Sequence, residues 1–484
     1  MPIDQSILEE LETVFYPDSI AIVGAPRDER KPGSLYVKGL LNAGFRGPLY
    51  LVNPSVVIVQ GIQTYSSLIS IPGSIDYVIV NIAKRFILDL LDECREKNVK
   101  VIQIFTAGFG ESDEDGASDL EQKIVQKARS LGIRVIGPNC IGVYNPAHRV
   151  SIPWVLPREA WKPGGVAYLC QSGGNTGFFL EISVKRGIRF SKAISYGNGT
   201  DIDSPDLLEY FGADPESEIV SAYIEGITDG ARFFEVLKEV SSLKPTVIWK
   251  GGLSGAGARA AGSHTASLAG SEVVWEAVLK QAGAIQVEGL EELADTILAF
   301  QTLPKLNSKR VAVISGLFGA GGGASVASCD ALSRQGLEVP VLNAETIAQL
   351  KNTLPFDGSI FQNPVDVGAI ATSDLVRFSK AVELVFSDQN IDMVIIHLPV
   401  KLLLCSFPVE YVDDIMEVFL KVRQTHNKPL IVLSQKLSAP IEEDLLEQKC
   451  AEAQIPTYST VERAAKAIAN VIKYQEFKAD ACAP

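Results

Sequence analysis

The stretch SIAIVGAPRDERKPGS, residues 19–34, carries the pattern that decides the fold: an apolar run ending in glycine, a polar turn and the start of a helix. The run SIAIVGA (19–25) is almost continuously apolar, as expected of a strand buried on both faces. A helix is predicted over 34–44, and a second apolar run, PLYLVNP (48–54), follows it. Strand, helix and strand in this order are typical of a parallel sheet covered by helices.

The same alternation continues to about residue 150. Its further elements are IDYVIVNI (75–82), a helix over 85–97, VKVIQIFTAG (99–108), a helix over 117–131 and IRVIGPN (133–139). A parallel sheet binds ligands in the crevice beyond the carboxyl ends of its strands. The candidate ligand contacts are therefore the polar and glycine residues at these ends: Gly24, Asn53, Asn81, Gly108 and Asn139.

Two more alternating units follow, separated by the proline-rich IPWVLPREAWKPGG (152–165) and by TLPKLNSKR (302–310). The second unit contains GVAYLCQSGGNTG (165–177), FSKAIS (190–195), EIVSAYIEGI (218–227), PTVIWKGG (245–252), a helix from about 271 and AIQVEG (284–289). The third contains RVAVISG (310–316), a helix near 320–335, IDMVIIHLP (391–399), KPLIVLSQ (428–435), a helix over 439–453 and IPTYST (455–460). Because 484 residues exceed what one hydrophobic core supports, we predict an α/β protein of three consecutive domains, over 1–150, 151–303 and 304–484.

Composition narrows the class of function. The net charge of −14 disfavours binding to nucleic acid or to an anionic membrane. The chain has neither a secretory leader nor an apolar stretch of the roughly 18 residues that a spanning helix needs, so a cytoplasmic location is expected. Seven cysteines without a CxxC pair and four histidines without HExxH spacing predict no bound metal.

The turn after the first strand combines glycine with positive charge. It is neither GxGxxG nor a Walker loop, and a tight structural turn explains Gly24 about as well when this residue is taken alone. Arg27, Arg30 and Lys31 form a basic island in an acidic chain. With the polar strand ends, they favour a nucleotide-like ligand at a helix N-terminus.

The stretch QSGGNTG (171–177) repeats this arrangement in the second unit. Ser172, Gly173 and Gly174 open a helix directly after a buried strand, where backbone N–H groups and the helix dipole suit a phosphate group. Ser172 fits an ordinary N-cap equally well.

His264 lies among small residues in GLSGAGARAAGSHTASLAG (252–270). A lone histidine is more often a satisfied surface or core residue than a catalyst, but this ring has few side chains to pack against. Small residues favour a mobile loop, and neutral imidazole is a competent nucleophile. We therefore expect a loop whose histidine accepts a phosphoryl group.

Glu225 ends the strand SAYIEG, where the crevice of the second unit is expected. There it would accept the second imidazole N–H and stabilise the charge on the ring. The alternative is a solvated loop carboxylate, which Glu225 taken alone favours.

Several stretches together resemble the NDP-forming acyl-CoA synthetases, a family that includes ADP-forming acetate–CoA ligase and succinyl-CoA synthetase. PDSIAIVGAPRD (17–28), LVNP (51–54) and IRVIGPNCIGVYNP (133–146) resemble its Rossmann-like CoA-binding domain. GVAYLCQSGG (165–174), YGNGTDIDSPDLLEY (196–210), YIEGI (223–227) and GSHTASLAGSE (262–272) resemble its ligase domain, and QNPVDV (362–367) resembles its flavodoxin-like third domain. The resemblance spans nearly the whole chain, and SHTASLAG is its most specific part.

The resemblance implies that acyl-CoA and phosphate give acyl phosphate and CoA, that the acyl phosphate phosphorylates His264, and that the group then passes to ADP. By this resemblance Glu225 supports the histidine, and Ser172, Gly173 and Gly174 bind phosphate. The expected coenzyme A contacts are Gly24, Ala25, Arg27, Lys31, Asn53, Asn81 and Asn139.

The chain contains no ATP-grasp domain, so the resemblance also implies a separate ATP-grasp β subunit that binds ADP or ATP with Mg²⁺, in a heterotetramer or similar assembly. Two stretches depart from the family. QSGGNTGF replaces the usual QSGALG and leaves the acyl substrate open, and ISGLFGAGGGASVAS (314–328) replaces ITNGGGPG and leaves the role of that glycine loop open.

Two other functions compete with this interpretation. A paralogue that binds acyl-CoA as a sensor or scaffold without transferring phosphate is the alternative, and the presence of both His264 and Glu225 counts against it. A nicotinamide-dependent dehydrogenase lacks support, because GxGxxG is absent and Asn53 stands where a ribose-binding acid is expected.

Overall fold

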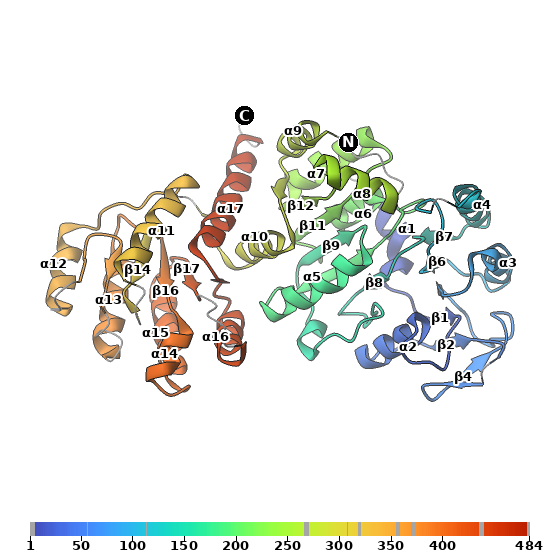
Figure 1. Ribbon diagram of the computed structural model, residues 1–484, viewed down its shortest axis with the longest axis horizontal. Helices are drawn as coiled ribbons and strands as arrows, with labels where there is room; N and C mark the ends of the chain where they lie inside the picture. Colours follow the sequence, from blue (N-terminus) through green and yellow to red (C-terminus); the bar gives the residue numbers. More distant parts are fainter. Residues whose placement is uncertain are drawn as a thin grey trace. The chain divides into compact units, whose positions relative to one another are not determined.

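Strand β1, Ile20–Val23, lies at the centre of the first sheet and is buried throughout, as expected from its uninterrupted apolar sequence. The computed structural model describes residues 5–481 apart from 56, 113, 266–270, 307, 318–320, 355–358, 369–373 and 435–439. Seven strands follow the order β3-β4-β2-β1-β5-β6-β7, all parallel to their neighbours except β3 against β4 (Figure 1). The other strands are β2 (Leu49–Val52), β3 (Ile58–Val59), β4 (Ile62–Tyr65), β5 (Tyr77–Val80), β6 (Val101–Ile104) and β7 (Arg134–Ile136).

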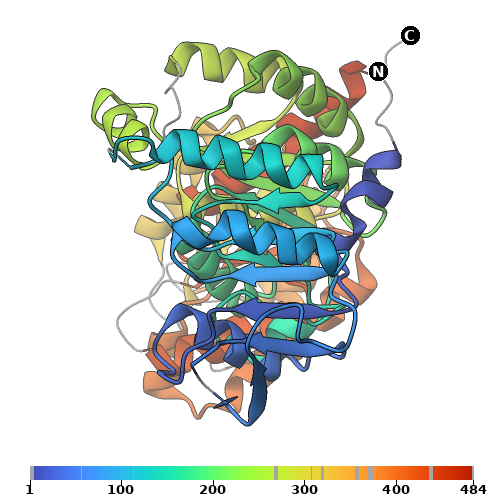
Figure 2. The same ribbon diagram turned by 90° about the vertical axis from the view of Figure 1, so that its right-hand side faces the viewer.

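Helices cover both faces of this sheet because both sets of alternating β1 side chains are apolar. The helices are α2 (Pro32–Ala43), the 3-10 turn η1 (Lys84–Phe86), α3 (Ile87–Glu96) and α4 (Ala117–Ser130). Ile20 and Ile22 pack in the core cluster that includes α2. Ala21 and Val23 pack in the opposite cluster, which includes α3 and α4, and Figure 2 shows these two helices across the face turned to the viewer.

The second sheet has six strands in the order β13-β12-β11-β9-β10-β8. Its strands are β8 (Gly142–Tyr144), β9 (Val166–Cys170), β10 (Phe190–Ser195), β11 (Ile219–Ile224), β12 (Thr246–Lys250) and β13 (Ile285–Val287). Its helices are η2 (Arg158–Trp161), α5 (Gly173–Lys185), α6 (Ser204–Ala213), α7 (Gly230–Leu243), α8 (Gly255–Thr265) and α9 (Glu272–Ala282), and α10 (Leu290–Thr302) follows β13. Strand β8 pairs antiparallel with β10, although its residues fall within the predicted first domain.

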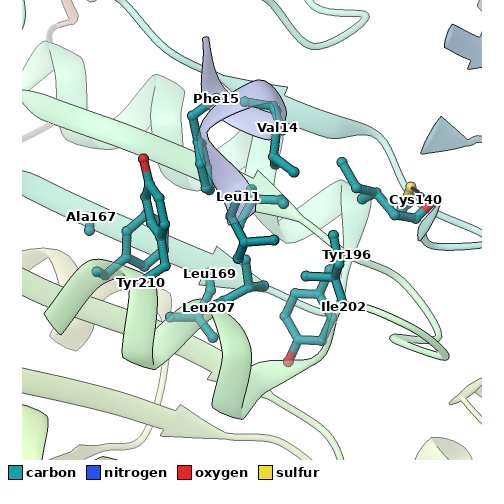
Figure 3. Packing of buried hydrophobic residues seen from close by; sticks show 14 of the residues in the cluster. Leu11, Val14, Phe15, Cys140, Ala167, Leu169, Tyr196, Ile202, Leu207 and Tyr210 are labelled. Atoms are coloured by element: carbon teal, nitrogen blue, oxygen red, sulfur yellow. Dashed lines mark hydrogen bonds between the residues drawn. The ribbon is translucent and has the colours of Figure 1, made fainter. Parts of the chain in front are cut away.

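The first two sheets share one hydrophobic core, which the sequence pattern did not indicate. Helix α1 (Ser6–Phe15) begins the chain but packs against α6 of the second sheet. The rings of Phe15 and Tyr210 stack with centroids 4.6 Å apart, and Figure 3 shows Leu11 and Phe15 facing Leu207 and Tyr210. This continuous apolar contact makes one compact unit of Met1–Val184 and Arg189–Leu293.

The second compact unit, Lys185–Ile188 with Ala294–Pro484, contains a five-stranded parallel sheet in the order β15-β14-β16-β17-β18. Its strands are β14 (Val311–Ser315), β15 (Val365–Asp366), β16 (Met393–His397), β17 (Leu430–Leu433) and β18 (Thr457–Tyr458). Its helices are α11 (Gly322–Arg334), α12 (Ala344–Thr353), α13 (Leu375–Ser387), α14 (Val400–Ser406), α15 (Tyr411–Thr425), α16 (Pro440–Glu452) and α17 (Val461–Ala481).

The QNPVDV motif explains how the short strand β15 is held at the edge of this sheet. The Asn363 side-chain oxygen accepts the Val313 N–H at 3.0 Å, and its Nδ2 donates to the Val311 carbonyl at 2.9 Å. The amide thus extends the sheet pairing beyond the two residues of the strand.

The predicted α/β class, with three successive sheets of mostly parallel strands, is confirmed. The limits 1–150, 151–303 and 304–484 remain a prediction. None of the helices in the described part of the chain is long and apolar enough to cross a membrane.

Candidate active site

The register of the first sheet brings three of the predicted strand-end residues together. Val23 lies opposite Val52 on one side and Val80 on the other, so Gly24, Asn53 and Asn81 are adjacent beyond the strand ends. The chain also crosses from one side of β1 to the other between β2 and β5, which places a ligand crevice at this point.

Two glycines allow the backbone to pack tightly here. Gly24 has φ +91°, and a Cβ on it would lie 2.5 Å from the Asn81 carbonyl oxygen. A Cβ on Gly33, in the first turn of α2, would lie 2.3 Å from the Gly24 carbonyl oxygen. The N-terminus of α2 therefore lies directly against the turn after β1. This is a sterically required turn and also the arrangement that cradles a phosphate.

The asparagines at this edge differ in what they bond. The Asn53 Nδ2 donates to the carbonyl of the buried Ala25 at 2.9 Å, and its side-chain oxygen accepts the Ser55 N–H at 3.0 Å, so this side chain holds the turn. The side-chain oxygen and nitrogen of Asn81 are buried, and neither has a hydrogen-bond partner among the described residues. Buried polar groups are normally paired, so Asn81 is the amide that a ligand would satisfy.

The basic island lies on the outer surface of the turn. Arg27, Arg30 and Lys31 are all exposed, and Arg30 also pairs with Asp28 at 3.0 Å. Of the three cations, the structure thus uses Arg30 within the turn itself.

Asn139 lies where the first two sheets meet. It follows the cis peptide bond Gly137–Pro138, has φ +59°, and its N–H donates to the Thr106 carbonyl at 3.2 Å. A Cβ on Gly197 would lie 2.4 Å from the Asn139 carbonyl oxygen, so the YGNGT loop (196–200) of the second sheet is pressed against this residue.

Residues of that loop form a polar cluster that the sequence analysis missed. The Asn198 Nδ2 donates to Glu111 at 2.7 Å, and Glu111 in turn accepts the N–H groups of Gly108 and Phe109. Burial acts to raise the pKa of Glu111, but the hydrogen bonds from Asn198 and these backbone groups outweigh it and lower the pKa. The cluster fixes the loop after β6, which carries the predicted contact Gly108.

At the second-sheet edge, Ser172 caps helix α5. Its hydroxyl accepts the Asn175 N–H at 3.3 Å, which confirms the N-cap interpretation. A Cβ on Gly173 would lie 2.8 Å from a methyl carbon of Ile141, whereas a Cβ on Gly174 would meet nothing within 4 Å. The helix N-terminus is thus closed by Ile141 on one side and open at Gly174, where an anion has room.

The expectation that Glu225, taken alone, is a solvated carboxylate is wrong. Glu225 is only 6% exposed, and its carboxylate accepts the Tyr223 hydroxyl at 3.0 Å. The Gln171 side-chain oxygen accepts the N–H groups of both Glu225 and Gly226. The buried strand pairing, which holds Tyr223 opposite Cys170, brings this turn beside the start of α5.

Lys250 was also missed, because a lysine ending an apolar strand gives no motif. It lies at the end of β12 and is 4% exposed, and its Nζ donates to the Glu225 carbonyl at 2.7 Å. Burial lowers the pKa of Lys250 to about 8, and the Glu225 carboxylate partly opposes this shift.

Within the described residues, no three His, Cys, Asp or Glu side chains are grouped as metal ligands.

The prediction that His264 lies on a loop is corrected for its backbone. Helix α8 (Gly255–Thr265) includes His264, because three alanines in its middle offset the helix-weakening effect of its glycines. The side chain of His264 and residues 266–270 lie outside the described part of the chain, as do residues 318–320 of the third-unit glycine loop.

Two protein families match the parts that build this site. Residues 18–146 match the CoA binding domain family, and residues 163–300 match the succinyl-CoA ligase like flavodoxin domain family. Both matches fall within the predicted first and second domains.

Relatives extend over nearly the whole chain. An ADP-forming acetate–CoA ligase II subunit alpha from Pyrococcus furiosus is 36% identical over 94% of this chain and 96% of its own length. An ADP-forming acetate–CoA ligase I from Archaeoglobus fulgidus is 35% identical over 80% of this chain but only 54% of its own length.

Solved structures are also similar to this protein over nearly the whole chain. An acetyl-coenzyme A synthetase 1 from Ca. Korarchaeum cryptofilum, described in complex with phosphate and ADP, has a TM-score of 0.82 at 28% identity and covers 98% of this chain and 99% of its own. A protein from Pyrococcus horikoshii has a TM-score of 0.79 at 31% identity, and the match covers 97% of this chain and 99% of that protein. Similarity of this extent in sequence and structure shows that the chain belongs to the family of ADP-forming acetate–CoA ligase α subunits.

Proposed function

We propose that this chain is the α subunit of an ADP-forming acyl-CoA synthetase, which interconverts acyl-CoA, ADP and phosphate with a carboxylic acid, ATP and CoA. The observation that carries the proposal is the 36% identity to an α subunit over 94% of this chain. The site geometry supports it, because the N-termini of α2 and α5 follow strands β1 and β9, and the buried carboxylate of Glu225 follows β11, a neighbour of β9.

Three steps balance the reaction. A phosphate oxygen attacks the acyl carbon of the thioester, the C–S bond breaks, and CoA leaves. A nitrogen of His264 then attacks phosphorus of the acyl phosphate, the P–O bond breaks, and the carboxylate leaves. In the last step the terminal phosphate oxygen of ADP attacks phosphorus, the N–P bond breaks, and ATP forms. The chain is therefore a ligase that forms a carbon–sulfur bond when the reaction runs in reverse.

The residues divide this work by position. Gly24 and Gly33 allow the turn after β1 to pack against the N-terminus of α2, whose backbone N–H groups bind a phosphate of CoA in this proposal, and Asn81 supplies the unsatisfied amide. Arg27, Lys31 and Asn139 border the same crevice in this proposal. Ser172, Gly173 and Gly174 open α5 to the transferred phosphate, and Glu225 accepts an imidazole N–H and stabilises phosphorylated His264.

The relatives support a second chain in the complex. Relatives named as α subunits imply a separate β subunit. The longer Archaeoglobus fulgidus relative carries nearly half its length beyond the part matched here. We propose that an ATP-grasp β subunit supplies the corresponding part and binds ADP or ATP with Mg²⁺, in a heterotetramer or similar assembly.

A labelling experiment tests the relay. The chain, purified with its partner from the native source, is incubated with a panel of acyl-CoAs and radiolabelled phosphate without ADP. We expect acid-labile, base-stable label on the wild-type chain and none on His264→Ala. His426→Ala, which removes an imidazole from the other compact unit, is the matched control and should label like wild type.

Absence of label with every acyl-CoA, in protein that still binds CoA, would contradict the relay and favour the sensor or scaffold alternative. Label that survives in His264→Ala would place the phosphoryl group on another residue.

A further inference from the structure

The ammonium group of Lys250 contacts three separate segments at the active-site edge of the second sheet. Its Nζ donates to the Glu225 carbonyl at 2.7 Å and to the carbonyl of Gly251, the residue that follows β12. The same Nζ lies 5.0 Å from the centre of the Trp275 ring on α9, within the range of a cation–π interaction.

Two of the contacted residues, Gly251 and Trp275, come before and after the segment of chain that carries His264. The chain leaves the sheet at Gly251, passes through α8 with His264, and reaches Trp275 in the first turn of α9. Lys250 therefore binds the chain both before and after this segment, as well as the main chain of Glu225. Strand pairing reinforces the arrangement, because Ile224 lies opposite Lys250 and the Gly251 N–H donates to the Ile224 carbonyl at 2.9 Å.

We propose that Lys250 is a positioning residue for phosphoryl transfer, which fixes the main chain of Glu225 relative to both ends of the His264 segment. The inference rests on the proposed function, because it assigns Lys250 a part in forming phosphohistidine. Lys250 acts through the backbone it holds and does not touch the transferred group.

The charge of Lys250 makes this role dependent on pH. Burial lowers the pKa of the amine to about 8, so the ammonium loses its proton as the pH rises through 8. Hydrogen bonds from a charged donor are roughly twice as strong as those from a neutral one, so the two carbonyl contacts weaken above that pH. The group holds its partners best below pH 8.

The groups that surround Lys250 do not change their charge near pH 8. The carboxylate of Glu225, which follows β11, is the charged group that acts on Lys250, and burial keeps Tyr223 of β11 protonated by raising its pKa. Burial also raises the pKa of Cys170, at the end of β9, to about 11. Trp275 on α9 and Val287 on β13 carry no charge.

The chain offers a matched control at the other end of the same strand. The Lys244 Nζ donates to the carbonyls of Phe211 and Asp214 at 2.8 and 2.6 Å, and burial likewise lowers its pKa. Lys244 precedes β12, whereas Lys250 ends it, so Lys244 lies away from the active-site edge.

The experiment measures the rate of phosphohistidine formation from acyl-CoA and phosphate between pH 6.5 and 9.5, in the complex with its partner chain. We expect the wild-type rate to fall above about pH 8. Lys250→Met should lower the rate by about 10- to 100-fold at pH 7, the factor that a lost charged hydrogen bond represents, and should remove the fall near pH 8. Lys244→Met should keep the wild-type rate and profile.

Lys250→Arg keeps a permanent charge and is the second test of position. This variant should restore most of the rate of phosphohistidine formation and shift the decrease in rate to higher pH. CoA binding and the midpoint of thermal unfolding show whether each variant is folded. A folded Lys250→Met with the wild-type rate and profile would overturn the inference while the proposed function stands. Absence of label in the wild type would instead refute the proposed function.

Discussion

At Gly24 the backbone passes so close to Asn81 that no side chain fits between them. The residue has positive φ and a neighbouring carbonyl 2.5 Å from where a Cβ would lie, so conformation and space both require glycine. Gly44 also has positive φ, but a Cβ there would meet nothing within 4 Å. Substitutions at Gly24 and Gly44 therefore distinguish the effect of a steric clash from that of left-handed backbone strain alone.

Gly24→Ala should lower the free energy of unfolding by about 2–4 kcal/mol, from overpacking and left-handed strain together, and should abolish CoA binding. Gly44→Ala should cost only about 1 kcal/mol and leave CoA binding unchanged. Urea unfolding followed by circular dichroism and calorimetric titration with CoA measure the two effects. Equal losses of stability in both variants would show that the close approach does not matter.

The side-chain amide of Asn81 lowers the stability of the ligand-free fold and is available to bind a ligand. Its two polar atoms are buried without hydrogen-bond partners in the described structure, which costs about 1–3 kcal/mol for a group of this kind. Asn81→Leu should therefore leave the thermal midpoint of the ligand-free protein unchanged or raise it, while CoA affinity falls about tenfold. A drop in the midpoint with full CoA affinity would show that the amide serves the fold alone.

At the level of elements, β16 and α11 are joined by a buried histidine. His397 is 3% exposed, and its Nε2 lies 2.8 Å from the Ser328 hydroxyl of α11. Burial lowers the pKa of His397 to about 4. The ring is therefore neutral in the folded protein at any pH at which unfolded histidine, with a pKa near 6.5, begins to take up a proton.

This shift predicts acid sensitivity of the second compact unit. Above pH 6.5 the ring is neutral in both states and the full stability is present; as the pH falls towards 4 the unfolded chain gains a proton first, and about 3 kcal/mol is lost. His397→Gln should flatten this loss. Peptide-resolved hydrogen exchange over residues 294–481 at pH 4.5 and 7 measures it, and an unchanged pH dependence in the variant would assign the acid sensitivity to other groups.

Elements also show where sequence reasoning succeeded and failed. The long apolar runs around β1, β9 and β14 predicted strands buried on both faces, because such burial requires them to be apolar throughout. Helix α8 was expected as a loop, since its glycines obscure the alanine-rich centre. Strand β8 was missed because its three residues become a strand only through pairing with β10, which lies about fifty residues further along the chain.

Across the whole molecule, a buried ion pair joins the first two sheets. Asp201, which follows β10 and the YGNGT loop, accepts Arg129 Nε at 2.6 Å, Arg134 Nε at 3.0 Å and the Val135 N–H at 2.7 Å. Its side chain is fully buried, whereas the two arginines are partly exposed. These contacts supplement the shared hydrophobic core of the first compact unit.

Asp201→Ala should destabilise this unit by about 2–4 kcal/mol, because it leaves two arginines and a backbone N–H without their shared carboxylate. All four tryptophans lie between residues 154 and 275, so tryptophan fluorescence during urea unfolding reports on this unit. Asp28→Ala removes an exposed ion pair with Arg30 and should leave the transition unchanged. Equal, small effects in both variants would show that Asp201 does not join the sheets.

The sequence by itself determined the α/β class, the three sheets and the family, because continuous apolar strands and local motifs are properties of neighbouring residues. It also singled out Gly24, Ser172 and Glu225. Only the tertiary structure decided that Asn81 is unsatisfied while Asn53 is not, that Glu225 is buried, and that Lys250 joins Glu225 to the His264 segment. Each of these depends on hydrogen-bond partners or neighbours distant in the chain, and strand register, not local sequence, selects them.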